Sequence, residues 1–171
     1  MKKLIFTLLM LPLLVGAQKQ DVYVKLVDAK GTMLKGDVVT RGFENHLNAL
    51  TLATTGSNNS VVNFTMNITG ASADLKKAIA NKEYLMSGYI TVTQIGSNGM
   101  PITVYTIAME KIKVQSCNES MGCNSEMTTS VTIQPVRIGW TYYQNNIKSG
   151  IKTVSNKYGF DAETGGAWTN F

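Results

Sequence analysis

The stretch VVNFTMNI, residues 61–68, alternates apolar and polar side chains from Val62 onward. The apolar members are Val62, Phe64, Met66 and Ile68, and the polar members are Asn63, Thr65 and Asn67. Because successive side chains of a strand point to opposite faces, the stretch predicts a strand with one buried face and one wetted face. It indicates a fold built on β-sheet.

Similar enrichment in β-branched and aromatic residues recurs along the chain. It predicts further strands over residues 21–28, 85–95, 102–114 and 127–143. Turn-forming residues separate these runs at 55–59, 96–99 and 117–123. The Gly-rich segment 96–99 lies between two of the predicted strands, so we expect it to form a hairpin connection.

One segment has helical rather than strand spacing. In SADLKKAIAN, residues 72–81, the apolar positions are 75, 78 and 79. We expect Ser72 to cap the helix, Asp74 to lie in its first turn and Asn81 to end it. Numerous short strands with a single helix predict a sandwich or a closed barrel, in one domain over residues 18–171.

The predicted strand over residues 102–109 is apolar on both of its faces. Ile107 and Met109 lie on one face, and Ile102, Val104 and Ala108 on the other. A strand of this kind needs cover on both sides. Either the helix or a neighbouring subunit could supply the second cover, and the pattern does not choose between them.

Residues 1–17 have the organisation of a secretory signal peptide. Lys2 and Lys3 precede a short apolar run, and Gly16-Ala17 supply small residues before a polar segment. The run is too short to cross an apolar bilayer core of about 30 Å. We expect cleavage near Ala17 and a secreted or periplasmic protein without membrane insertion, with an uncleaved anchor as the alternative.

The basic excess of the chain does not indicate a nucleic-acid partner. Sixteen Lys and Arg residues face eleven Asp and Glu residues, for a net charge of +5. Two of the basic residues, Lys2 and Lys3, belong to the predicted signal peptide. The others are scattered and are not interleaved with aromatic residues, as a nucleic-acid-binding surface would require.

The two cysteines, Cys117 and Cys123, lie close together in a polar segment. In an exported protein this spacing favours a local disulfide that staples a loop. A redox-active pair is the alternative, but the segment lacks the Cys-x-x-Cys spacing that lowers the pKa of a thiol.

Catalytic motifs are not apparent in the sequence. The chain has one histidine, His46, and two cysteines. A His-based triad would have to use His46, and the chain has too few cysteines and histidines for a Cys/His zinc cluster. Neither the Gly-x-Ser-x-Gly elbow of hydrolases nor a phosphate-binding loop occurs. We therefore expect a protein that is not an enzyme and that has no catalytic residues, metal or other cofactor.

The order of several loose motifs resembles one known family. They are DVYVKL at 21–26, the helix segment at 74–78, YITV at 89–92, RIGWTY at 137–142 and YGFD at 158–161. Together they resemble the haemolysin-coregulated protein (Hcp) family, the tube protein of type VI secretion systems.

The resemblance implies a β-barrel of two packed antiparallel sheets with one short α-helix. It further implies hexameric rings that stack into a tube, which carries small effectors and works with other type VI components. Lys76, Lys77 and Asn81 would face the pore, and a loop over residues 35–48, with Lys35, Arg41 and Asn48, would reach the next ring. The alternative is an exported Hcp-like binding or adhesion module outside any contractile machine.

Overall fold

A computed structural model describes residues 20–55, 60–96, 99–121, 127–145 and 152–171. The helix is α1 (Gly70–Asn81). The strands are β1 (Gln20–Val27), β2 (Leu47–Thr54), β3 (Val62–Asn67), β4 (Tyr84–Ile95), β5 (Pro101–Met121), β6 (Met127–Asn145), β7 (Lys152–Asp161) and β8 (Gly166–Ala167). The predicted signal peptide, residues 1–17, lies outside the described residues. Within the described part of the chain, α1 is too short and too polar to cross a bilayer.

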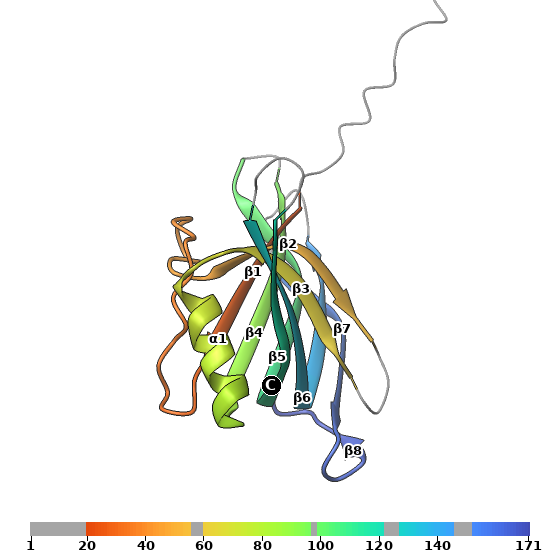
Figure 1. Ribbon diagram of the computed structural model, residues 1–171. Coiled ribbons are helices and arrows are strands. Elements are labelled where there is room, and N and C mark those ends of the chain that lie inside the picture. Colours follow the sequence, from red (N-terminus) through yellow and green to blue (C-terminus); the bar gives the residue numbers. More distant parts are fainter. Residues whose placement is uncertain (1–19, 56–59, 97–98, 122–126, 146–151) are drawn as a thin grey trace, which may run out of the picture.

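The strands form an antiparallel barrel that closes on itself (Figure 1). Pairing runs in the order β3-β2-β1-β4-β5-β6, and β3 also pairs with β6, which closes the barrel. Only the first half of β6 takes part in that closure. Its second half pairs with β5 on one side and with β7 on the other, so β7 and β8 extend beyond the barrel.

The alternating stretch over residues 61–68 supplies part of the core. Val62, Phe64 and Met66 are buried on β3, whereas Ile68 lies just beyond the strand and is partly exposed. Their neighbours in the core come from every strand of the barrel and from α1. The predicted barrel with one helix is confirmed.

The hairpin after β5 begins later than the sequence suggests. We expected a turn over residues 117–123, but β5 continues to Met121 and pairs with β6 up to Met127. Cys117 is buried in the core, where its inward side chain continues the apolar face of the strand. The predicted hairpin at 96–99 is confirmed, since the main-chain N–H of Gly96 donates to Met100 O and β4 pairs with β5.

Helix α1 begins earlier than predicted. Thr69 is the N-cap, and Ser72 lies inside the first turn, where its Oγ accepts a hydrogen bond from the N–H of Thr69 at 3.4 Å. Ser72 Oγ also lies 3.1 Å from Thr129 Oγ1, which ties the helix to β6. Asp74 falls after the first turn, and the helix ends at Asn81 as expected, with Lys82 in the left-handed conformation at φ 55°.

The two faces of β5 receive different covers. Ile107 and Met109 are fully buried inside the barrel. Ala108 lies on the outer face, in a groove that is lined by Phe43 of the loop after β1 and by Phe171. The chain's own loop and its segment 168–171 thus cover part of this outer face, whereas α1 lies on the inner side with Leu75 in the core.

Candidate functional site

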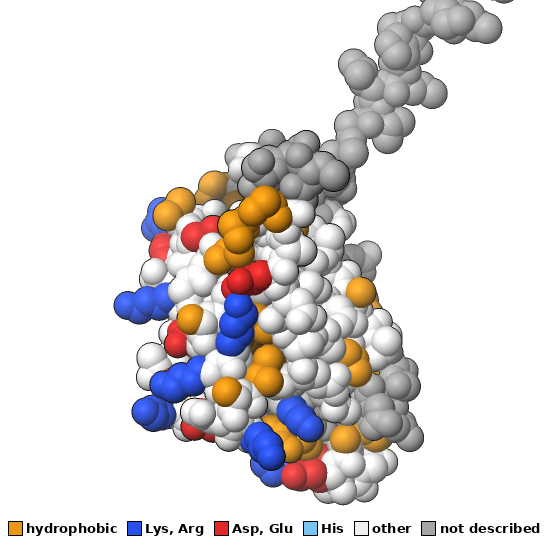
Figure 2. All heavy atoms as spheres, viewed as in Figure 1, with side chains coloured by type: hydrophobic (Ala, Val, Ile, Leu, Met, Phe, Trp, Pro, Cys, Tyr) orange, Lys and Arg blue, Asp and Glu red, His pale blue; other side chains and the backbone are white. Residues whose placement is uncertain are grey.

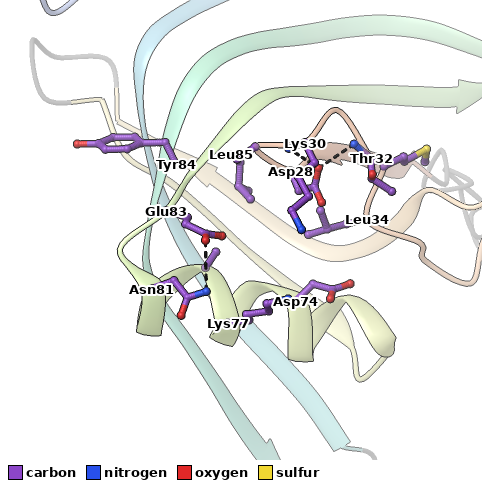
Figure 3. A pocket seen from close by; sticks show the side chains of 13 residues that line it. Asp28, Lys30, Thr32, Leu34, Asp74, Lys77, Asn81, Glu83, Tyr84 and Leu85 are labelled. Carbon is purple, nitrogen blue, oxygen red and sulfur yellow. Dashed lines mark hydrogen bonds between the residues drawn. The ribbon is translucent and has the colours of Figure 1, made fainter.

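The exposed face of α1 borders a hollow of about 390 Å³ (Figure 3). Lys77 and Asn81 reach it from the helix, and the loop after β1 forms the opposite wall. That wall is held in place by Asp28, whose Oδ1 accepts the N–H groups of Lys30 at 2.9 Å and Thr32 at 2.7 Å. The loop therefore presents a fixed surface to the helix.

Side chains of both charges line this hollow. The carboxylates are Asp28, Asp74 and Glu83, and the ammonium groups are Lys30 and Lys77. Asn81 Nδ2 donates to Glu83 Oε1 at 3.3 Å. Figure 2 shows the same mixture of basic and acidic side chains over this side of the molecule. Such a wall favours hydration over the binding of one charged ligand.

Lys76, the third helix residue predicted to face the pore, is separated from the other two. Its Nζ lies 2.6 Å from Glu119 Oε1, near the end of β5. Both side chains are partly exposed, at 47% and 34%. The structure thus brings Lys77 and Asn81 together on the hollow, whereas Lys76 pairs with Glu119 of β5.

The loop predicted to reach the next ring ends sooner than the sequence indicates. Lys35 and Arg41 are exposed on it, but β2 begins at Leu47, so Asn48 lies within that strand opposite Tyr23. Asn48 was therefore wrongly assigned to the loop. Its strand pairing explains this, because a residue paired with β1 cannot belong to a projecting segment.

The loop is braced against the barrel by Phe43, which lies in the turn beyond its paired arms. The ring of Phe43 stacks on Tyr23 at 4.1 Å between centroids. The N–H of Asn45 donates to Val38 O, and that of Val38 donates to His46 O, so the two arms of the loop pair. Val39, close to the tip, is 90% exposed. This leaves an exposed apolar side chain beside a turn that is anchored to the barrel.

A second surface, which the sequence did not identify as a site, lies on β6 and β7. Tyr142 and Tyr158 are exposed by 48% and 60% on the face that they share with Tyr105 and Trp140, and Val154 is exposed by 57% beyond the register irregularity, where it is the partner of Tyr143. We call these three residues the β6–β7 surface. Tyr158 stacks on Trp140 with ring centroids 5.9 Å apart, and Tyr142 lies 4.7 Å from Tyr105. Burial raises the pKa of Tyr105 above its ordinary value, so this hydroxyl stays neutral.

The outer edge of β7 adjoins this surface. Among the described residues, β8 pairs with β7 only through Phe160 and Asp161. Residues 152–158 are exposed and pair with β6 on their other side. An exposed strand edge of this length is a template for pairing with another chain.

The predicted disulfide is tested only in part, because Cys123 lies outside the described residues. Cys117 is buried, and its Sγ lies 3.7 Å from Ser72 O. A strand advances about 3.4 Å per residue, so Met121 lies about 13 Å from Cys117. Because a disulfide needs Cα atoms within about 7 Å, a bond would require the chain after Met121 to fold back over β5. The pairing stays a prediction.

The comparison with family models identifies one family. The family model described as "Type VI secretion system effector, Hcp" matches residues 23–142. A search of curated protein sequences finds no significant match.

Solved structures show the same fold at low sequence identity. The crystal structure of Hcp1 from Salmonella typhimurium is similar with a TM-score of 0.72 and 15% identity, covering 87% of this chain and 99% of that one. A structure described as a type six secretion system protein gives a TM-score of 0.74 at 14% identity, covering 88% and 100%. The secreted protein Hcp3 from Pseudomonas aeruginosa gives 0.64 at 17%, covering 81% and 98%.

The family match extends over most of the barrel, from β1 to the second half of β6. It favours a structural role in secretion over the alternative of an exported binding or adhesion module. The chain belongs to the Hcp family, the structural tube subunits of type VI secretion systems.

Proposed function

We propose that six copies of this chain form a ring and that the rings stack into a tube that carries small effectors. One observation supports this most strongly. The barrel is already closed, yet the chain carries an exposed apolar surface and an exposed strand edge beyond it. A barrel that closes on itself has no need of β7, whereas a subunit that must join a neighbour does.

The β6–β7 surface is the proposed contact between neighbours in a ring. Tyr142, Val154 and Tyr158 would be buried by a second copy, and the outer edge of β7, with which no described residue pairs over 152–158, could add main-chain hydrogen bonds. Tyrosine is enriched at protein interfaces because it buries a large apolar ring and retains a polar hydroxyl. A heterologous contact of this kind closes into a ring when its rotation fits.

The hollow between α1 and the loop after β1 has mixed charges, and we place it on the side of the subunit that faces the pore. Lys77 and Asn81, with the acidic residues around them, offer a hydrated surface past which a folded cargo can slide. A wall of one charge would hold a cargo of the opposite charge. We assign Lys77 and Asn81 to the pore, and Lys76, which pairs with Glu119, to the part of the helix surface beside it.

The loop over residues 35–46, which we call the braced loop, is the proposed contact between stacked rings. Lys35, Arg41 and Val39 are exposed on it, and Val39 lies near its tip. Figure 1 shows this loop on the side of the barrel away from β7. Ring closure and ring stacking would therefore use different surfaces of the same subunit.

Export by the predicted signal peptide, and a disulfide between Cys117 and Cys123, complete the proposal. Residues 1–17 would direct the chain out of the cytoplasm, to a periplasmic or secreted location. In that compartment a bond between the cysteines would be stable. Other type VI components would be its partners there, and the role is structural rather than catalytic.

Light scattering during size-exclusion chromatography of residues 18–171 tests the ring. We expect a species with six times the mass of one chain, which dissociates on dilution. A monomer that persists at the highest attainable concentration would contradict the proposal.

A further inference from the structure

A pair of glycines forms a slot on the outer face of β6 and β7. Gly139 and Gly159 are register partners on these strands. A Cβ atom on Gly139 would lie 2.5 Å from the ring of Phe171, and one on Gly159 would lie 2.4 Å from the same ring. Because contacts this short are not tolerated between carbon atoms, the slot exists only while both positions are glycine. Phe171 fills it.

Polar contacts fix the segment that carries this ring. The Nζ of Lys157 donates to Thr169 O at 3.1 Å and to Phe171 O at 2.7 Å, and it lies 4.1 Å from the centre of the Phe171 ring. The N–H of Trp168 donates to Gly159 O at 3.0 Å. The rings of Trp168 and Phe171 are 4.8 Å apart. The strand residues in these contacts, Lys157 and Gly159, both belong to β7.

The contacts matter because β7 is an edge strand whose residues 152–158 pair only with β6 among the described residues. It lies outside the closed barrel, and its residues 152–158 are exposed. Its pairing with β6 has a register irregularity between Tyr142 and Tyr143. An edge strand with a single partner depends on side-chain packing across its faces to stay ordered. Segment 168–171 supplies that packing on the outer face.

We propose that segment 168–171 is a clamp that positions β7, and with it the outer strand edge, for joining a second copy of the chain. Phe171 is its main positioning residue, and Gly139 and Gly159 form the receptor. This inference rests on the proposed function, since it concerns how the proposed contact surface is held. The partner is a second copy, and the clamp acts through β7 without touching that copy.

Two substitutions release the clamp in different ways. Phe171→Ala empties the slot without introducing a clash. Gly159→Ala keeps every residue of the segment but drives it out, because the new methyl group would also lie 2.2 Å from Trp168 O. Gly166→Ala is the matched control, since its nearest contact, Thr164 Oγ1 at 3.5 Å, is an ordinary one.

Two measurements separate the clamp from a general loss of fold. Amide hydrogen exchange reports β7 and the barrel strands individually. Light scattering reports assembly. In Phe171→Ala we expect exchange in residues 152–158 to become faster while β1 and β4 stay protected. The association constant should fall by about tenfold or more, which is the effect of losing order in one interface element.

The outcomes distinguish the clamp from the ring itself. A native protein that does not assemble would overturn the proposed function, whereas faster exchange of β7 in Phe171→Ala would still support the clamp. If exchange and assembly are both unchanged in Phe171→Ala and in Gly159→Ala, the clamp proposal is wrong. The proposal that the chain forms a ring is not affected by that result. If Gly159→Ala fails to fold, Phe171→Ala decides alone, because it adds no atoms.

Discussion

Arg137 on β6 donates from Nε to Asp161 Oδ2 at 2.9 Å, which links β6 to the end of β7. Its Nη1 also donates to Glu110 Oε2 on β5 at 3.0 Å. One guanidinium group thus bridges three neighbouring strands, two of them in the barrel and one beyond it. Asp161 is buried and accepts further hydrogen bonds from the N–H groups of Glu163 and Thr164, so it also shapes the turn to β8.

This arrangement predicts a loss of stability in acid. Burial alone would raise the pKa of Asp161, but the hydrogen bonds from Arg137, Glu163 and Thr164 outweigh it and hold the pKa below its ordinary value. A depressed folded-state pKa contributes stability above the unfolded value of about 3.9 and loses it as pH falls through the folded value. Urea unfolding from pH 7 to pH 2 should show this loss.

Asp161→Asn should remove the contribution. Its unfolding free energy should be lower at pH 7 and less dependent on pH below about 4. Asp74→Asn, an exposed residue of α1, is the control and should keep the pH dependence of the native protein. An Asp161→Asn protein with the native pH profile would show that the Arg137 contact carries none of it.

The two faces of α1 should respond very differently to truncation. Leu75 is fully buried in the core, so Leu75→Ala should lower the unfolding free energy by about 2–5 kcal/mol. Lys77→Ala, on the exposed face, should stay within about 0.5 kcal/mol. Chemical denaturation measures both. Equal effects of the two substitutions would contradict the assignment of Lys77 to an exposed pore surface.

Ring closure and ring stacking should separate by mutation. Val154→Asp places a charge on the β6–β7 surface, where burial without a partner is costly, and should lower the association constant for rings by about tenfold or more. Val39→Asp makes the same change on the braced loop and should leave rings intact while reducing their stacking. Light scattering and electron microscopy, read together, distinguish the two. Loss of rings in Val39→Asp alone would reverse the proposed assignment.

The Lys76–Glu119 pair should contribute little to stability. Both groups are partly exposed, so water and salt screen their attraction in spite of the 2.6 Å distance. A double-mutant cycle with Lys76→Met and Glu119→Gln should give a coupling energy of about 1 kcal/mol or less, smaller still in 0.5 M salt. A coupling that is large and independent of salt would place this pair among the main supports of the helix.

The sequence predicted the buried strands well and the exposed ones poorly. Residues 61–68 alternate because one face of β3 is buried, and that burial is what the pattern reports. β7 has no such pattern, since its residues 152–158 are exposed on both faces, and it is a strand because β6 offers it an edge to pair with. β2 is interrupted by an irregularity between Ala49 and Thr51, which shifts the alternation partway along.

The sites show a similar division. Lys77 and Asn81 are four residues apart on one helix, so the sequence could place them together. Lys76 does not share their direction, because consecutive helical residues do not face each other. Its pairing with Glu119 depends on where β5 ends, which no local pattern encodes. The slot for Phe171 was not predictable either. It depends on Gly139 and Gly159 meeting across two strands, and neither glycine has a local signal that identifies a receptor.

Negative-stain electron microscopy of residues 18–171 is the most direct test of the central claim. We expect rings with six-fold symmetry that stack into tubes as the concentration rises. We also expect Val154→Asp to weaken these rings, so that they form only at higher concentration, while the barrel stays folded by circular dichroism. Single particles of one chain at every concentration, with a folded barrel, would contradict the claim that this chain is built to assemble.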